Sequence, residues 1–180
     1  FGLVGSEMCI RDSYLSKEIS SGPIPNDTEE FIKAEKEAKE KINVFMNNKG
    51  SKRVDYFHKK LGKIMWNKCG MARNKKDLES AIKEISALRK DFWKNVKVPG
   101  SQNEFNEELA KAGRVADFLE LGELFAKDAL EREESCGGHF REEYQTNEGE
   151  ATRKKEFKFV SAWAVSYTHL RAHETEQQHE

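Results

Sequence analysis

Apolar residues between positions 51 and 134 recur every three or four residues in three successive runs, which restricts the fold more than any other feature of the chain. Such spacing places apolar side chains on one face of an α-helix, and that face must be buried against another element. The first run ends near Gly70, the second begins at Asn74, and residues 98–100 break it before the third. We therefore expect a bundle of three helices at 51–134. Its faces would be Val54, Phe57, Leu61, Ile64, Met65 and Cys69, then Leu78, Ala81, Ile82, Ile85, Leu88 and Phe92, then Phe105, Leu109, Ala112, Ala116 and Leu119.

The third helix is expected to be the longest and to be covered only in part by the other two. From a capping box at Ser101 and Glu104 to about Glu134 it would be roughly 50 Å long, against roughly 30 Å for a twenty-residue helix. Glycines at 113 and 122 indicate close approach of a neighbouring backbone. Its second half is apolar around much of its circumference, which indicates burial on several sides. We expect it to pack on protein outside this chain, through Phe118, Leu119, Leu121, Leu124, Phe125 and Leu130.

Other elements are expected on both sides of the bundle. A preceding amphipathic helix would begin with Asp27 as its N-cap and end at residues 47–50, with Phe31, Ala34, Ala38, Ile42 and Phe45 on its apolar face. Residues 140–144 and 157–163 are expected to be extended, and two short strands do not form a stable sheet by themselves. Since charged residues make up 35% of the chain and alternation is confined to its end, we expect a mainly α fold with a short β segment.

A polar motif, residues 132–144, follows the third helical pattern directly. It contains Arg132, Glu134, Ser135, His139 and Arg141, with two adjacent glycines at 137 and 138. The glycines free the backbone for a left-handed end to the helix. Since such an end needs one glycine and no histidine, the motif predicts a further role.

The polar motif resembles the pattern Arg-x-Glu-Ser-Arg-Gly-x-His-x-Arg near the C-terminus of the flavoprotein subunits of succinate dehydrogenase and fumarate reductase. Cys136 departs from it, because the commoner pattern has a second Arg there. The resemblance runs from about Tyr14 to Ala164 and includes residues 54–62, 65–73, 91–96 and 114–124. It implies that the chain is a fragment of a larger α+β flavoprotein. Residues 14–50 would end a flavin-domain segment and form a linker helix, 51–134 the bundle, and 135–164 the motif loop and extended segment.

By this resemblance the parent subunit would hold FAD in an upstream domain, interconvert succinate and fumarate, and pass electrons to an iron–sulfur subunit. Its partners would place it at the inner face of the cell membrane. Because the chain has no Gly-x-Gly-x-x-Gly loop, we expect it to bind no cofactor and to contain no catalytic residue. Its role would be to brace the flavin domain. Candidate interface residues are Arg132, Glu134, Ser135, His139, Arg141, Leu121 and Phe125.

Several alternatives stay open at this point. Arg132 and Arg141 could bind a carboxylate of a partner, or Glu134, Glu142 or Glu143 of the same domain. The parent could be a related flavoenzyme such as L-aspartate oxidase or adenylylsulfate reductase. The chain could also be a self-contained helical interaction module with no redox role.

Metal and nucleophile sites are weaker interpretations. Cys69, Cys136, His58 and His139 lack the closely spaced pairs of structural zinc sites, and Cys69 falls on an apolar helix face. Cys136 and His139 could form a nucleophile and base. However, a helix C-terminus disfavours a thiolate, so an unreactive thiol is expected.

Charge and hydropathy argue against two further classes of function. Lys59, Lys60 and Lys63 form a basic patch, but acidic residues throughout the helices favour a solvated helix face over a nucleic-acid site. No apolar run approaches the ~20 residues of a membrane span, so we expect no direct membrane insertion.

The two ends resemble translated sequencing-adapter DNA. These segments are residues 1–13, with Gly-Ser-Glu-Met-Cys-Ile-Arg-Asp-Ser at 5–13, and residues 165–180, with Val-Ser-Tyr-Thr-His-Leu-Arg-Ala-His-Glu-Thr at 165–175. We expect both to be unpacked and exclude them from the domain. The exclusion removes two of the 31 basic and five of the 32 acidic residues, so the remainder stays close to neutral.

Overall fold

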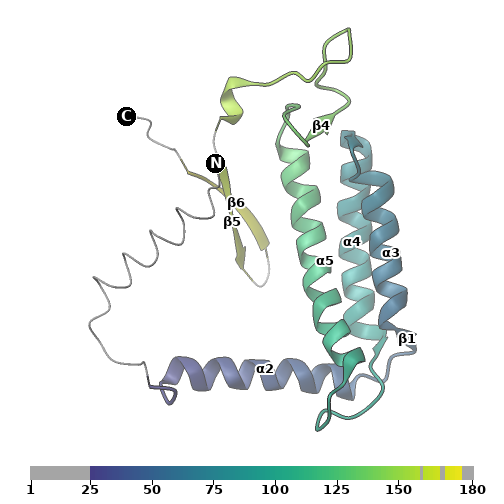
Figure 1. Ribbon diagram of the computed structural model, residues 1–180, viewed down its shortest axis with the longest axis vertical. Helices are drawn as coiled ribbons and strands as arrows, with labels where there is room; N and C mark the ends of the chain where they lie inside the picture. The colour runs from purple at the N-terminus through teal and green to yellow at the C-terminus, as the bar shows by residue number, and fades with distance from the viewer. Residues whose placement is uncertain (1–24, 159, 167–168, 176–180) are drawn as a thin grey trace, which may run out of the picture. The chain divides into compact units, whose positions relative to one another are not determined.

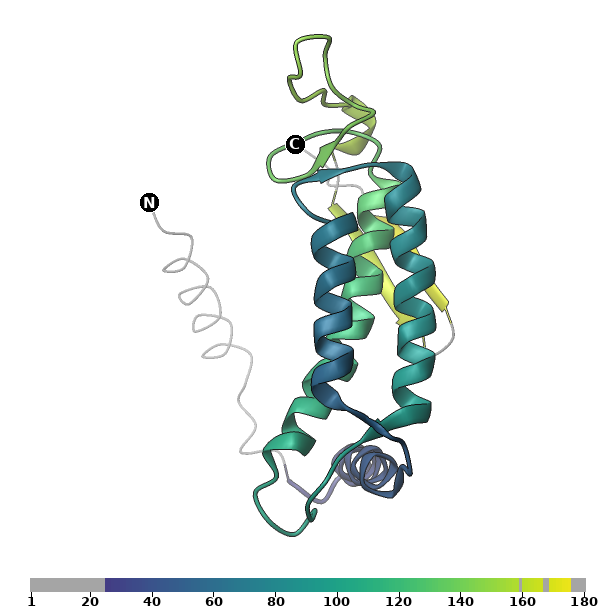
Figure 2. The same ribbon diagram turned by 90° about the vertical axis from the view of Figure 1, so that its right-hand side faces the viewer.

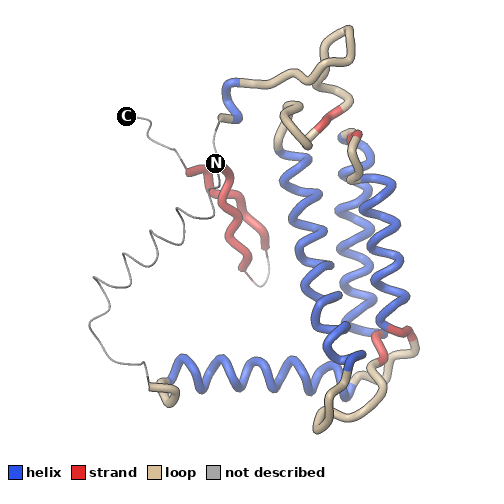
Figure 3. Tube along the Cα trace, in the orientation of Figure 1, coloured by secondary structure: helices blue, strands red, loops and turns tan. Residues whose placement is uncertain are grey.

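A computed structural model describes residues 25–158, 160–166 and 169–175 of the chain. It divides into two compact units, Phe1–Lys41 and Ile42–Glu180. The described part is mainly helical, as expected (Figure 3). The segments expected at 1–13 and 14–19 lie outside the described residues. In order, the elements are α2 (Glu29–Asn47), β1 (Lys52–Arg53), α3 (Val54–Lys68), β2 (Ala72–Arg73), α4 (Lys75–Asn95), β3 (Val96–Lys97), α5 (Glu107–Glu131), β4 (Phe140–Arg141), the 3-10 helix η1 (Lys155–Phe157), β5 (Val160–Ser166) and β6 (His169–Thr175).

The predicted three-helix bundle forms the core of the second unit. Helices α3, α4 and α5 lie side by side in both views (Figures 1 and 2). Burying each large apolar side chain contributes about 1.5–3 kcal/mol relative to exposure, so these faces account for the association of the helices. All three predicted faces contain fully buried residues: Phe57, Leu78, Ala81, Ile85, Phe92, Ala112 and Leu119 are 0% exposed.

Two short parallel strand pairs tie the ends of the helices together, and no pattern in the sequence indicated them. β1 pairs with β3 through Lys52 and Val96, and β2 pairs with β4 in the register Ala72 to Phe140. The expectation of an extended segment at 140–144 is therefore right only for Phe140 and Arg141. Their partner strand lies within this chain.

Helix α5 begins later and ends earlier than expected. Its N-cap is Asn106, whose side chain accepts a hydrogen bond from Leu109 N at 3.0 Å. The Asn106 amide also donates to the carbonyls of Pro99 and Ser101, which fixes the preceding loop. The predicted capping box at Ser101 and Glu104 is thus wrong, and Phe105 lies outside the helix, 93% exposed. With 25 residues, α5 is about 37 Å long rather than 50 Å.

The second half of α5 presents an apolar stripe, defined as Phe118, Leu121 and Phe125. These side chains are 42%, 59% and 42% exposed, as expected for a face without a partner in the bundle. Gly122 is buried on the other side, where an added Cβ would lie 3.3 Å from Leu61 Cδ1. The close neighbours there are side chains, not backbone. Among the described residues Gly113 has no such neighbour, so a close approach there by protein outside this chain stays a prediction.

Helix α2 spans the boundary between the two units. It begins at Glu29, two residues after the predicted cap Asp27, and ends at Asn47 as expected. Its exposed surface carries ion pairs one turn apart, for example between Glu35 and Lys39 at 2.5 Å. At its end in the second unit, Phe45 is buried and stacks on Trp93 with 5.2 Å between ring centroids.

The C-terminal segment differs from its expected form. Phe157 lies in η1 and not in a strand, and β5 pairs with β6 as an antiparallel hairpin in the register Val160 to Thr175. Residues 165–166 and 169–175, expected to be unpacked, are paired in this hairpin. Their origin as translated adapter sequence stays a prediction. Within the described residues, no helix is long and apolar enough to cross a membrane.

Candidate functional site

The two glycines of the polar motif form a hairpin turn and do not end the helix. Cys136 N donates to His139 O at 2.8 Å, and His139 N donates to Cys136 O at 3.0 Å. Gly137 between them has φ of +57°, a conformation that favours glycine. Helix α5 has already ended at its C-cap Arg132, which is extended. The predicted glycine helix end is therefore wrong.

The end of α5 is closed instead by the side chain of Arg141, which is 1% exposed. Arg141 Nη1 donates to the carbonyls of Ala129 at 2.8 Å and Leu130 at 3.0 Å. These carbonyls belong to the last turn, where the helix itself supplies no partner and the helix dipole favours a cation. Arg141 Nε donates to Glu143 Oε2 at 3.1 Å. The strand pair β2–β4 holds Arg141 in this position.

Other predicted residues of the motif bind one another. Ser135 is fully buried, and its Oγ accepts from Arg141 N at 2.8 Å and donates to Arg141 O at 3.1 Å. Glu134, 3% exposed, accepts from Arg132 Nη1 at 2.8 Å and from Lys154 N at 2.9 Å. The two arginines therefore bind Glu134 and Glu143, carboxylates of their own domain.

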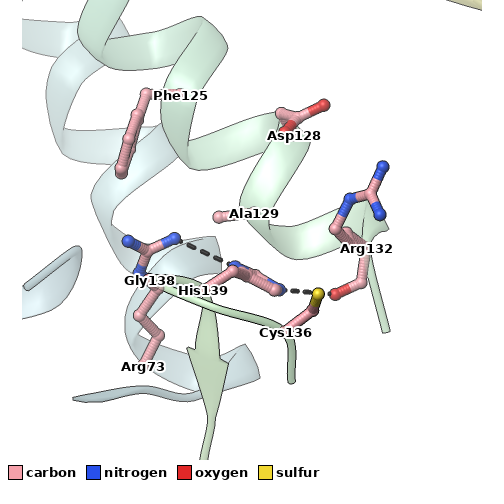
Figure 4. Close-up of a pocket in the computed structure, with 8 residues that line it drawn as sticks. All are labelled: Arg73, Phe125, Asp128, Ala129, Arg132, Cys136, Gly138 and His139. Carbon is pink, nitrogen blue, oxygen red and sulfur yellow. Dashed lines mark hydrogen bonds between the residues drawn. The ribbon is translucent and has the colours of Figure 1, made fainter. Parts of the chain in front are cut away.

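His139 joins this network to the loop after α3. His139 Nδ1 lies 3.0 Å from Arg73 Nη1, and His139 Nε2 lies 2.9 Å from the carbonyl of Arg132 (Figure 4). A guanidinium can only donate, so Nδ1 accepts and Nε2–H donates, which defines a neutral imidazole. Burial lowers the pKa of His139, and the charges of Arg73, Arg141 and Arg132 lower it further, against the opposing effect of the Arg132 carbonyl.

These groups surround a cleft of about 430 Å³ beside the end of α5. Its lining residues are Arg73, Phe125, Asp128, Ala129, Arg132, Cys136, Gly138 and His139 (Figure 4). Of the predicted candidates, Arg132, His139 and Phe125 reach the cleft, whereas Leu121 does not line it. Sequence analysis did not identify Arg73 as a site residue. It lies 66 positions from His139, and only the β2–β4 pairing brings the two together.

A protein-family model, described as the C-terminal part of the fumarate reductase flavoprotein, matches residues 58–179. The chain belongs to this family. It is the C-terminal domain of a fumarate reductase or succinate dehydrogenase flavoprotein, in agreement with the resemblance of the polar motif.

Individual relatives agree with membership of this flavoprotein family. The chain is 28% identical over 137 residues to the fumarate reductase flavoprotein subunit of Helicobacter pylori, covering 76% of this chain and 19% of that protein. It is 35% identical over 95 residues to a CoM/CoB fumarate reductase chain of Methanothermobacter marburgensis, covering 53% and 17%. The chain thus spans less than a fifth of these two relatives.

Solved structures show the same fold inside larger chains. A quinol-fumarate reductase with menaquinol molecules matches with a TM-score of 0.73 and 20% identity, over 94% of this chain and 28% of that chain. Sdh1 of Mycobacterium smegmatis in complex with UQ1 matches with a TM-score of 0.72 and 23% identity, over 92% and 26%. The fold of this chain therefore matches about a quarter of each of these larger chains.

The two described cysteines of this flavoprotein domain differ in environment. Cys69 is buried in the core, as expected, and burial raises the pKa of its thiol. Cys136 is half-buried and lines the cleft. No group of three His, Cys, Asp or Glu side chains in the described part of the chain is placed to hold a metal ion.

Proposed function

We propose that this domain belongs to a subunit that interconverts succinate and fumarate with FAD held in an upstream domain, and that passes electrons to an iron–sulfur subunit. The observation that carries the proposal is the match of residues 58–179 to the C-terminal part of the fumarate reductase flavoprotein. Several matching relatives are named as fumarate reductase flavoprotein subunits, such as that of Helicobacter pylori. Through its partners the subunit would lie at the inner face of the cell membrane.

In this proposal the domain itself carries out no chemistry and braces the flavin domain. The contacts of the polar motif support such a role, because Arg141, Ser135 and Glu134 direct their polar groups at one another and at the end of α5. These buried residues would not contact the flavin domain themselves but would hold the interface residues in position. Its accessible part would be the apolar stripe with Leu121 and Phe125, together with Arg132 and His139 beside the cleft.

A domain exchange tests the proposal directly. The matching region of the Helicobacter pylori subunit would be replaced by this chain, and retained FAD and fumarate reduction would be measured in the purified subunit. We expect the hybrid to keep its flavin and a measurable part of its activity. A hybrid carrying Leu121→Glu should lose both, since that side chain would face the flavin domain. If the Leu121→Glu hybrid matched the unmodified hybrid, bracing through the apolar stripe would be contradicted.

Two further measurements separate the alternatives. Purified by itself, the 180-residue chain should carry no flavin absorbance after gel filtration, and near-stoichiometric FAD would contradict catalytic silence. Protein expressed from the reading frame extended upstream should contain FAD and reduce fumarate. Oxidation of L-aspartate by that protein would identify a related flavoenzyme as the parent, and absence of FAD would favour a self-contained helical module.

A further inference from the structure

The guanidinium of Arg73 is held in a fixed orientation at the edge of the cleft. Arg73 Nε donates to the carbonyl of Gly70 at 3.0 Å, and Nη1 donates to His139 Nδ1 at 3.0 Å. Its Cζ lies over the ring of Phe125, 4.8 Å from the ring centroid. Three contacts from three segments of the chain therefore fix a side chain that would otherwise have many rotamers. Because the Arg73 side chain is already ordered in the folded domain, a ligand that binds it causes little further loss of side-chain entropy.

The positive charge of Arg73 has no direct counter-ion within the described residues. No carboxylate there lies within ion-pair distance of it, whereas Arg132 and Arg141, the other arginines nearby, bind Glu134 and Glu143. The histidine that contacts Arg73 is neutral and cannot compensate the charge. A guanidinium has five N–H donors, and two of them are used, which leaves three for a ligand.

Asp128 also lines the cleft, but its negative charge acts on Arg73 without forming a direct ion pair. Its Oδ1 accepts a hydrogen bond from Trp163 Nε1 at 2.8 Å. Figure 4 shows its carboxylate directed away from Arg73, on the opposite side of Ala129. The part of the cleft between Arg73, His139 and Phe125 therefore combines a cation that has no direct ion pair among the described residues with a partly exposed aromatic ring.

We propose that this part of the cleft binds a carboxylate group, with Arg73 as the anion-binding residue and His139 as the residue that positions it. The planar fork of a guanidinium matches a carboxylate through two parallel N–H···O bonds. The carboxylate could come from a free dicarboxylate or from an Asp or Glu side chain of the adjoining flavin domain. The second source rests on the proposed function, whereas the site itself does not.

The test is a carboxylate titration of the full 180-residue chain. Sodium acetate and sodium succinate would be added, with sodium chloride at matched ionic strength as the reference, while NMR follows Arg73 Nε–H and the His139 ring. We expect a saturable shift of both signals that chloride does not reproduce. Succinate binding tighter than acetate by roughly tenfold would indicate a free dicarboxylate, and equal affinity per carboxylate would indicate a protein side chain.

Variants make the assignment specific to Arg73. Arg73→Gln should abolish the shift of the His139 ring, and Arg114→Gln, which removes the same charge at an exposed position of α5, should leave it unchanged. Arg73→Lys keeps the charge and should weaken binding by roughly tenfold through loss of the fork, which gives a second measurement if the Gln variant does not fold. The proposal is overturned if no Arg73-dependent shift occurs up to about 100 mM carboxylate, or if chloride produces the same shift.

Discussion

Arg141 Nη1 donates to the main-chain carbonyl of Ala129 at 2.8 Å, so a side chain from β4 completes the last turn of α5. The same nitrogen reaches the carbonyl of Leu130, and Nε reaches Glu143. Because Arg141 is almost fully buried, these groups have no access to water as a substitute partner. The polar motif, which resembles the family pattern, thus supplies through Arg141 the hydrogen-bond donor that closes the C-terminal end of α5.

Replacing Arg141 with Met should destabilise the chain strongly. The variant keeps most of the side-chain volume but leaves two helix carbonyls without a donor, so we expect the free energy of unfolding to fall by about 3 kcal/mol. Urea denaturation followed by circular dichroism measures this loss. Arg114→Met, at an exposed position of α5, is the matched control and should change the free energy of unfolding by less than about 0.5 kcal/mol. Equal losses in the two variants would show that Arg141 does not close the helix.

The neutral state of His139 makes stability depend on pH in a defined direction. Its folded-state pKa lies below the ordinary value of 6.5, so as pH falls the unfolded chain takes up a proton at this position first. Stability should therefore decrease as pH falls through 6.5 towards the folded pKa, and this contribution should be constant above 6.5. The charges around the ring are Arg73, Arg132 and Arg141, with Asp128 across the cleft.

His139→Gln tests this pH dependence. The Gln amide can accept from Arg73 and donate to the Arg132 carbonyl, but it does not titrate. Urea midpoints at about pH 7.5 and pH 5.5 should differ less for the variant than for the parent chain. All other titrating groups are common to both proteins, so an unchanged difference would mean that folding does not shift the pKa of His139.

Leu119 and Leu121 offer a matched pair on α5. Leu121→Glu should change the free energy of unfolding by less than about 0.5 kcal/mol and reduce self-association and hydrophobic dye binding, because the side chain is 59% exposed. Leu119→Glu should prevent folding, because Leu119 is 0% exposed and a buried unpaired carboxylate costs several kcal/mol. Sedimentation velocity and thermal melts distinguish the two. Unfolding by Leu121→Glu would place that residue in the core.

The two possible caps of α5 can be separated by alanine substitution. Asn106→Ala should cost about 1–2 kcal/mol, because the Asn106 side chain accepts from Leu109 N and donates to two loop carbonyls. Ser101→Ala should cost less than about 0.5 kcal/mol, since among the described residues Ser101 Oγ accepts only from Asn103 N, in an exposed turn. Chemical denaturation of both variants gives the comparison. A larger loss of unfolding free energy for Ser101→Ala than for Asn106→Ala would support the capping box expected from the sequence.

Periodicity was sufficient to predict the helices and their buried faces. Phe57, Ile85 and Phe92 repeat at helical spacing and are buried, and Asn74, which precedes the second run, caps α4 by accepting from Asp77 N. The start of α5 could not be predicted in this way. Ser101 and Asn106 are both good caps, and the choice depends on the contacts of Asn106 with the loop before it.

Most of the geometry of the candidate site could not be predicted. Two adjacent glycines after a helix are compatible with a helix end and with a hairpin turn, and pairing of Cys136 with His139 decides for the turn. The partner of His139 could not be found either, because local patterns contain no information on contacts 66 positions apart. The histidine and second glycine of the polar motif, together with its resemblance to the family pattern, indicated that the segment has a role beyond ending the helix.

The parallel pairing of β2 with β4 has a consequence for the order in which the domain is made. Arg73 pairs in register with Arg141, so the cleft cannot form until β4, far downstream of Arg73, has been synthesised and has left the ribosome. Contacts of such long sequence separation form slowly, because closing the intervening chain costs entropy. A nascent or prematurely terminated chain that ends before Phe140 can still bury much of the bundle core, but it lacks the closed end of α5. An intact cleft therefore marks a domain whose synthesis has reached the polar motif.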